Sequence, residues 1–112
     1  MTSIVSSKLD ALPACPVERT VRMLSGRWRL MVLFRLNDGP MRFNALARSL
    51  APISPRILTH TLRDLEAEGL VWRRSKDSVP PHVSYGLTED GEALAPIFDE
   101  LAKWWLNRHG DS

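Results

Sequence analysis

Two prolines three residues apart, Pro52 and Pro55, place the strongest constraint on how this chain can fold. Pro52 has no backbone donor and disfavours a helical conformation in the residue before it, so an approaching helix must end there. Ser54 followed by Pro55 is typical of a helix start, with serine as the N-cap and proline in the first position. The sequence therefore predicts a short helix up to Leu50, a tight turn and a second helix over residues 54–68, which together form a helix-turn-helix.

The rest of the chain predicts one domain of helices with two short strands. Helices are expected over residues 16–24, 27–36 and 43–50 from their apolar spacing and the turn residues between them. The segment 27–36 is apolar on nearly all sides, which predicts that it is buried. A long last helix should begin at the N-cap Thr88, and Pro96 should kink or split it.

Two strands joined by a proline-stiffened loop follow the helix-turn-helix, and they are expected over residues 70–75 and 83–87. In the second strand the inward residues should be Val83, Tyr85 and Leu87, and the outward ones Ser84 and Gly86. The predicted fold class is mainly α with a small β-hairpin wing, a winged helix-turn-helix with added N- and C-terminal dimerisation helices. Residues 1–14 are expected to form a flexible N-terminal arm, and residues 15–112 the winged helix-turn-helix domain.

The charge of the chain is divided between two regions, although its formal net charge is only +2. Residues 15–76 contain twelve Lys or Arg and five Asp or Glu, whereas residues 77–112 contain two basic and seven acidic residues. Eleven of the twelve basic residues in the first region are arginines, which suit bidentate contacts to phosphates and guanine edges. This split predicts one surface for a polyanion and a second surface for another partner.

The helix over residues 54–68 has separate apolar and cationic faces. On a helical wheel, Leu58, Leu62 and Leu65 fall within about 40° of one direction and form the core face. Basic and hydrogen-bonding side chains lie on the other sides, which is the pattern of a helix that enters the major groove of double-stranded DNA. The wing over residues 73–83 is then expected on the flanking backbone or minor groove. The predicted DNA-binding residues are Arg42, Asn44, Ser54, Arg56, Thr59, His60, Arg63, Arg73, Arg74, Lys76 and His82.

Apolar residues recur along the last helix at three- and four-residue spacing, more than the core of one small domain needs. Trp104 and Trp105 are adjacent and point about 100° apart, so both cannot serve one narrow stripe. We expect the first and last helices to form a homodimer interface, because tryptophan is a common interface anchor. The residues predicted for this interface are Val17, Val21, Leu24, Phe98, Leu101, Trp104 and Trp105. The alternative is that both tryptophans cover the core of their own domain against the first helix.

Several short motifs occur in order along nearly the whole chain from Cys15 to Trp105. They are Cys15-Pro16, Gly26-Arg27-Trp28, Met41-Arg42-Phe43-Asn44, Ser54-Pro55-Arg56-Ile57-Leu58-Thr59, Leu62-Arg63-Asp64-Leu65, Pro80-Pro81-His82-Val83-Ser84-Tyr85 and Leu87-Thr88-Glu89-Asp90-Gly91. In this number and order they resemble the HxlR family of bacterial transcription regulators. The resemblance implies a homodimeric winged-helix regulator that binds operator DNA of palindromic character. The sequence departs mildly from the usual family pattern: Gly86 precedes Leu87-Thr88, and Ser84 replaces a commoner acidic residue. Neither change removes a function that the resemblance implies.

Cys15 lies directly before Pro16 and one turn before Arg19, where a helix dipole and a guanidinium group both favour a thiolate. The family resemblance implies that a cysteine at this position is a candidate redox sensor of oxidants or electrophiles, so a small-molecule or oxidant effector is one expectation. The chain contains one cysteine, so a disulfide would join two subunits or a small thiol. The alternative is that Cys15 is a small buried apolar side chain.

The sequence argues against an enzyme, a metal protein and a membrane protein. The histidines are scattered singly and none is expected beside Cys15, so we expect no catalytic residue, no metal and no cofactor. No run of about 18 apolar residues is present to cross a membrane, and the first residues lack a signal-peptide core. Together with the lone cysteine, this predicts a cytoplasmic protein. The remaining alternative is a winged helix that docks a protein without specific DNA binding.

Overall fold

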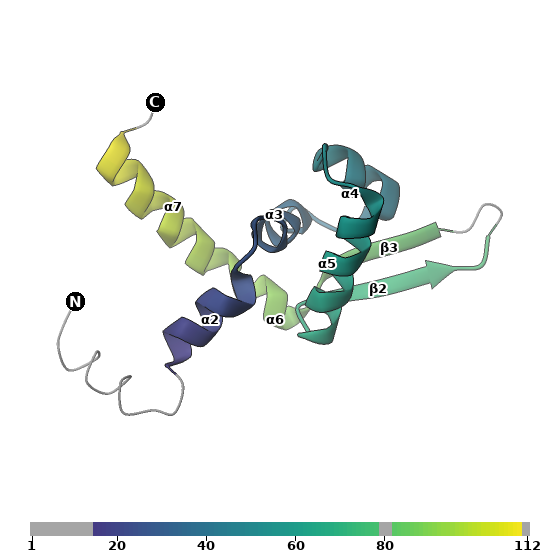
Figure 1. Ribbon diagram of the computed structural model, residues 1–112, viewed down its shortest axis with the longest axis horizontal. Coiled ribbons are helices and arrows are strands. Elements are labelled where there is room, and N and C mark those ends of the chain that lie inside the picture. Colours follow the sequence, from purple (N-terminus) through teal and green to yellow (C-terminus); the bar gives the residue numbers. More distant parts are fainter. Residues whose placement is uncertain (1–14, 79–81, 111–112) are drawn as a thin grey trace.

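Figure 1 shows helices around a small sheet in the computed structural model, which describes residues 15–78 and 82–110. The helices are α2 (Pro16–Leu24), α3 (Arg27–Leu36), α4 (Phe43–Ser49), α5 (Pro55–Ala67), α6 (Glu89–Glu92) and α7 (Ala95–His109). The strands are β1 (Met41–Arg42), β2 (Val71–Lys76) and β3 (His82–Leu87). The predicted winged helix-turn-helix is confirmed, whereas the predicted arm over residues 1–14 lies outside the described residues.

The core of the domain forms around α5. Leu58, Leu62 and Leu65 are each no more than 1% exposed, which confirms the predicted core face. Buried apolar residues of the neighbouring elements close around them: Val32, Leu33, Leu36, Leu46, Leu50, Ile53, Leu70, Val71, Tyr85 and Leu94. The three leucines fix the rotation of α5 about its axis, because any other setting would bring charged side chains into the core.

The sheet has the strand order β1-β3-β2, and both pairings are antiparallel. The sequence does not predict β1, because a two-residue strand is too short to show alternation. The boundaries of the hairpin also differ by one residue from those expected: β2 begins at Val71, and β3 begins at His82. Gly86 lies on the outer face of the sheet, as the sequence predicts, and it is buried there because the indole ring of Trp72 lies over it.

The composition of α3 predicts burial on all sides, and this prediction is wrong. One side of the helix, formed by Val32, Leu33 and Leu36, lies in the core. The apolar residues on its other side are 37–55% exposed: Leu30, Met31 and Phe34. A single small domain has a core on one side of such a helix only, so the second apolar side stays uncovered.

The C-terminal part of the chain forms two helices instead of one, as the position of Pro96 predicts. The Thr88 hydroxyl caps α6: it accepts a hydrogen bond from the Gly91 N–H at 3.1 Å and donates one to the Gly69 carbonyl at 2.6 Å. Pro96 then lies in the first turn of α7, where proline is tolerated. Leu94 is buried at the junction, but no residue of α7 itself is buried.

The two halves of the molecule present different elements to their surroundings (Figure 1). α2 and α7 lie on one side, and α7 projects away from the sheet; α4, α5 and the wing lie on the other side. The described chain measures 58 × 39 × 23 Å along its principal axes. None of the described helices is long and apolar enough to cross a membrane.

Candidate nucleic-acid interface

The start of α5 is held by its own cap. The Ser54 Oγ accepts a hydrogen bond from the Ile57 N–H at 3.1 Å, and the Ser54 carbonyl accepts one from the Leu58 N–H at 3.0 Å. Pro55 occupies the first helical position, as the sequence predicts. Ser54 thus orients the helix start, and its hydroxyl proton remains available for an anion. The helix dipole directs positive potential to the same end.

The outer face of α5 carries the cationic residues that the helical wheel places there. Arg56, His60 and Arg63 are exposed, and Thr59 is half-buried beside them. These residues line an open hollow of about 630 Å³. Ile57, 45% exposed, lines the same hollow; it is missing from the predicted set because an apolar residue next to the core stripe carries no clear signal. An exposed apolar side chain beside guanidinium groups suits the methyl group of thymine.

Asp64 connects α5 to α3 on the edge of this cationic face. Its Oδ2 lies 2.9 Å from the Arg29 Nη2 and 3.4 Å from the His60 Nε2. Arg29 also donates from Nη1 to the Met23 carbonyl of α2 at 2.7 Å. One guanidinium group therefore joins three helices. Sequence alone gives no signal for this contact, because Arg29 and Asp64 lie 35 residues apart along the chain.

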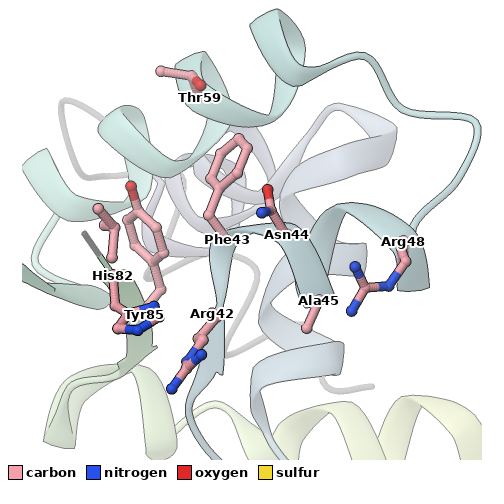
Figure 2. A pocket seen from close by; sticks show the side chains of 9 residues that line it. Arg42, Phe43, Asn44, Ala45, Arg48, Thr59, His82 and Tyr85 are labelled. Atoms are coloured by element: carbon pink, nitrogen blue, oxygen red, sulfur yellow. The ribbon is translucent and has the colours of Figure 1, made fainter. Parts of the chain in front are cut away.

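A second hollow of about 570 Å³ lies between α4, α5 and β3, and Figure 2 shows its lining. Arg42 and Asn44, both predicted phosphate contacts, line it together with Thr59 and His82. In Figure 2, Thr59 stands on the α5 side of the hollow and His82 on the opposite side of Phe43 from Arg48. Arg48 is an exposed cation in this lining that the sequence pattern does not single out.

The wing places its two arginines on opposite faces of the sheet. Neighbouring residues of a strand point to opposite faces, and directly paired residues of antiparallel strands share a face. Arg73 therefore shares the face of the core residue Tyr85, whereas Arg74 shares the other face with Lys76 and His82. Both arginines are exposed. Their contact with DNA stays a prediction, as does that of the other residues selected from the sequence.

A groove of about 520 Å³ lies between α2, α3 and α7, on the side of the molecule away from the wing (Figure 1). Its lining is almost wholly apolar and consists of Pro16, Val17, Thr20, Val21, Leu24, Ser25, Leu30, Leu94, Ile97, Phe98 and Leu101. Of the residues predicted for a dimer interface, Val17, Val21 and Leu101 are 58–61% exposed, and Leu24 and Phe98 are half-buried. A groove of this character is costly to leave in water.

The two tryptophans of α7 extend the apolar surface. Trp104 and Trp105 are 59% and 57% exposed, which contradicts the alternative that both cover the core of their own domain. The Arg108 Cζ lies 5.2 Å from the centre of the Trp104 ring, and the Trp105 ring stacks on His109 with centroids 3.8 Å apart. Further exposed apolar residues lie outside the predicted set: Leu30, Phe34, Ile97 and Leu106.

Cys15 is half-buried at the start of α2. Its carbonyl accepts a hydrogen bond from the Arg19 N–H at 2.9 Å, and its neighbour Pro16 lines the apolar groove. Cys15 is therefore adjacent in sequence to a residue of the apolar groove. Within residues 15–78 and 82–110, no group of three or more His, Cys, Asp or Glu residues is placed to hold a metal ion.

Known proteins share both the sequence pattern and the fold. A family model described as HxlR-like helix-turn-helix matches residues 23–111. An HTH-type transcriptional regulator of Methanothermobacter thermautotrophicus is 44% identical over 90 residues, which cover 80% of this chain and 69% of that protein. The reduced form of the redox regulator HypR is 39% identical, with a TM-score of 0.78 over 85% of this chain and 94% of that one. The reduced transcriptional regulator YodB of Bacillus subtilis is 33% identical, with a TM-score of 0.77 over 87% and 98%.

We expect Arg29→Ala to lower the free energy of unfolding by about 1–2 kcal/mol, because it removes the contact to Asp64 and the hydrogen bond to the Met23 carbonyl. Arg22→Ala is the matched control: its exposed pair with Glu18 at 3.7 Å should contribute about 0.5 kcal/mol or less. Urea unfolding at one protein concentration measures both. Equal losses in the two variants would contradict the role given to Arg29.

Proposed function

The chain belongs to the HxlR-like helix-turn-helix family and is a DNA-binding transcriptional regulator, and from this premise we propose that it acts as a homodimer on a palindromic operator. α5 enters the major groove, and the wing over residues 73–83 lies on the flanking backbone or minor groove. The observation that carries the proposal is the single exposed face of α5 with Arg56, His60 and Arg63. The buried leucines fix the orientation of that face, and its arginines are positively charged and long enough to contact base edges.

Each group on this surface has a chemical role in the proposal. Arg56 and Arg63 present planar guanidinium groups that suit the N7 and O6 acceptors of guanine. Thr59 and His60 offer further hydrogen bonds to base edges. Around α5, phosphate contacts fix the register of the helix on the duplex without reading its sequence. The residues proposed for these contacts are Arg42, Asn44, Ser54, Arg73, Arg74, Lys76 and His82.

The proposal assigns no catalytic residue, metal or cofactor to the chain and places it in the cytoplasm with its DNA. The relatives described above are regulators, and a single cysteine suits a reducing compartment. A winged helix that docks a protein without specific DNA binding is not favoured, because regulators of this family share the whole winged helix-turn-helix with this chain.

We expect Arg56→Ala and Arg63→Ala each to weaken binding to operator DNA by about 1–3 kcal/mol and to leave the fold intact. The measurement is fluorescence anisotropy with duplexes from the region upstream of the gene, at several salt concentrations. Arg22→Ala, which removes the same charge from α2, is the control and should bind as the unmodified protein does. Unchanged affinity in both α5 variants would remove that face from the interface.

We propose that the homodimer forms through α2 and α7. These helices contain no buried residue in the single chain, and their exposed apolar residues surround the groove between them. A second copy is the partner that the function needs, because one winged helix reads too few base pairs to define a unique site. A twofold pair reads half-sites about one helical turn apart and matches the symmetry of a palindrome.

We expect Trp104→Ala to raise the dimer dissociation constant by about thirtyfold, the equivalent of about 2 kcal/mol for a buried interface anchor. Trp104→Phe should retain most of the affinity because it keeps an aromatic ring at the contact. Sedimentation equilibrium from micromolar to nanomolar concentration measures both. A Trp104→Ala dimer that persists unchanged below micromolar concentration contradicts this interface.

We propose that Cys15 makes DNA binding sensitive to oxidants. Two related regulators have structures in two redox forms: HypR in reduced and oxidised forms, and YodB in reduced and diamide-treated forms. In this chain, two Cys15 thiols from different subunits, or Cys15 and a small thiol, would join as a disulfide, while the oxidant takes up two electrons and two protons. The new bond would restrain α2 beside the proposed interface and so alter the spacing of the two α5 helices.

We expect diamide to change operator affinity by about 5- to 150-fold, the usual range of coupling between two sites. The affinity of Cys15→Ser should not respond, because it has no thiol to oxidise. Anisotropy titrations before and after treatment give the affinity, and mass spectrometry identifies the disulfide. Complete oxidation of Cys15 without a change in affinity would rule out the switch.

A further inference from the structure

The outer face of the sheet, on the opposite side from Tyr85, brings together one residue from each strand. Arg42 of β1 pairs in register with Ser84 of β3, and Ser84 pairs on its other side with Arg74 of β2. Directly paired residues of antiparallel strands share a face, so the two arginines flank one hydroxyl group. Two strand spacings separate their backbones by about 10 Å, which both long side chains can bridge toward a point above Ser84.

This row of side chains is cationic and uncompensated. None of the three strands contains an acidic residue. Within the described part of the chain, neither Arg42 nor Arg74 forms an ion pair, and nor does Lys76, which shares the face. Guanidinium groups that extend toward one point repel one another unless an anion lies between them. The row therefore favours an anionic ligand.

Trp72 contacts Arg74 and restrains the position of its guanidinium group. Its indole ring lies over Gly86, the residue that it faces in the register, and a Cβ at Gly86 would overlap the ring. The Arg74 Cζ lies 4.8 Å from the centre of this ring. A guanidinium stacked on an indole is held in place through its face, while the N–H donors along its edge stay free for a phosphate.

We propose that Arg42, Ser84 and Arg74 form a binding site for one backbone phosphate of DNA, and that Trp72, seated on Gly86, is a positioning residue for Arg74. The inference rests on the proposed function, since it adds a defined phosphate contact to the wing. Two guanidinium groups and one hydroxyl offer enough donors to surround a phosphate oxygen pair. DNA is the favoured source of the phosphate because Arg42 continues directly into α4, whose Asn44 lines the hollow beside α5.

A double-mutant cycle on DNA affinity separates positioning from a general structural role. Arg74→Ala should weaken binding about tenfold at 0.1 M salt and reduce the slope of log affinity against log salt by about one, as expected for one lost phosphate contact. Trp72→Ala should weaken binding about two- to fivefold when Arg74 is present, the range for an exposed cation–π contact, and should have no effect in the Arg74→Ala background. Trp72→Phe should restore most of the affinity, and Gly86→Ala should reproduce Trp72→Ala because it displaces the ring.

Far-ultraviolet circular dichroism establishes that each variant is folded, and the following outcomes are decisive. Equal effects of Trp72→Ala with and without Arg74 would overturn the positioning role, and an unchanged salt slope in Arg74→Ala would overturn the phosphate site. If Trp72→Ala does not fold, the effects of Gly86→Ala and Trp72→Phe on DNA affinity are compared with and without Arg74 instead. Loss of binding in Arg56→Ala with an unchanged slope in Arg74→Ala would refute this inference alone, whereas salt-insensitive binding by the unmodified protein would refute the proposed function.

Discussion

The packing of Leu58, Leu62 and Leu65 against the core is the constraint on which the rest of the structure depends. These side chains are almost fully buried, and together they set the rotation of α5 about its own axis. A rotation by one residue, about 100°, would expose leucine and bury arginine, which costs several kcal/mol. The buried leucines on one side of α5 thus set the direction in which Arg56 and Arg63 point on the other side. The orientation of the DNA-facing side chains therefore depends on apolar packing.

The second constraint is that the two working surfaces share one small core. α5 and the wing use one side of it, and α2 and α7 leave their apolar residues on the other. Arg29 is the point where the two sides meet, because it contacts the carbonyl of Met23 in α2 and the carboxylate of Asp64 in α5. A displacement of α2 therefore acts on a group that also holds the DNA-facing helix. This arrangement gives a physical route between the apolar surface and the proposed DNA interface.

Local chemistry allowed much of the fold to be predicted from the sequence. Pro52, Ser54 and Pro55 act within a few residues of themselves, and the start of α5 agrees with the structure. Contacts between distant segments carry no such local signal. The salt bridge of Arg29 with Asp64, the strand at Met41–Arg42 and the positions of Arg48 and Ile57 in the two hollows beside α5 all depend on how elements meet in space. The predicted burial of α3 is wrong for the same reason. An apolar composition indicates that a helix is stabilised by contact with other apolar groups, but only the assembled fold shows whether its own chain provides them.

The absence of buried residues in α2 and α7 has a consequence for the protein in solution. Helices of nine and fifteen residues are marginal on their own in water, and most helix stability in proteins comes from tertiary packing. Within the chain, Met23 and Leu24 of α2 and Phe98 of α7 pack against the core but are only partly buried. In the proposed homodimer the second copy supplies the rest of the packing, so the order of both helices depends on mass action as well as on sequence and falls as the protein is diluted. On that proposal, the amount of the protein in a cell helps to set what fraction of it is completely folded.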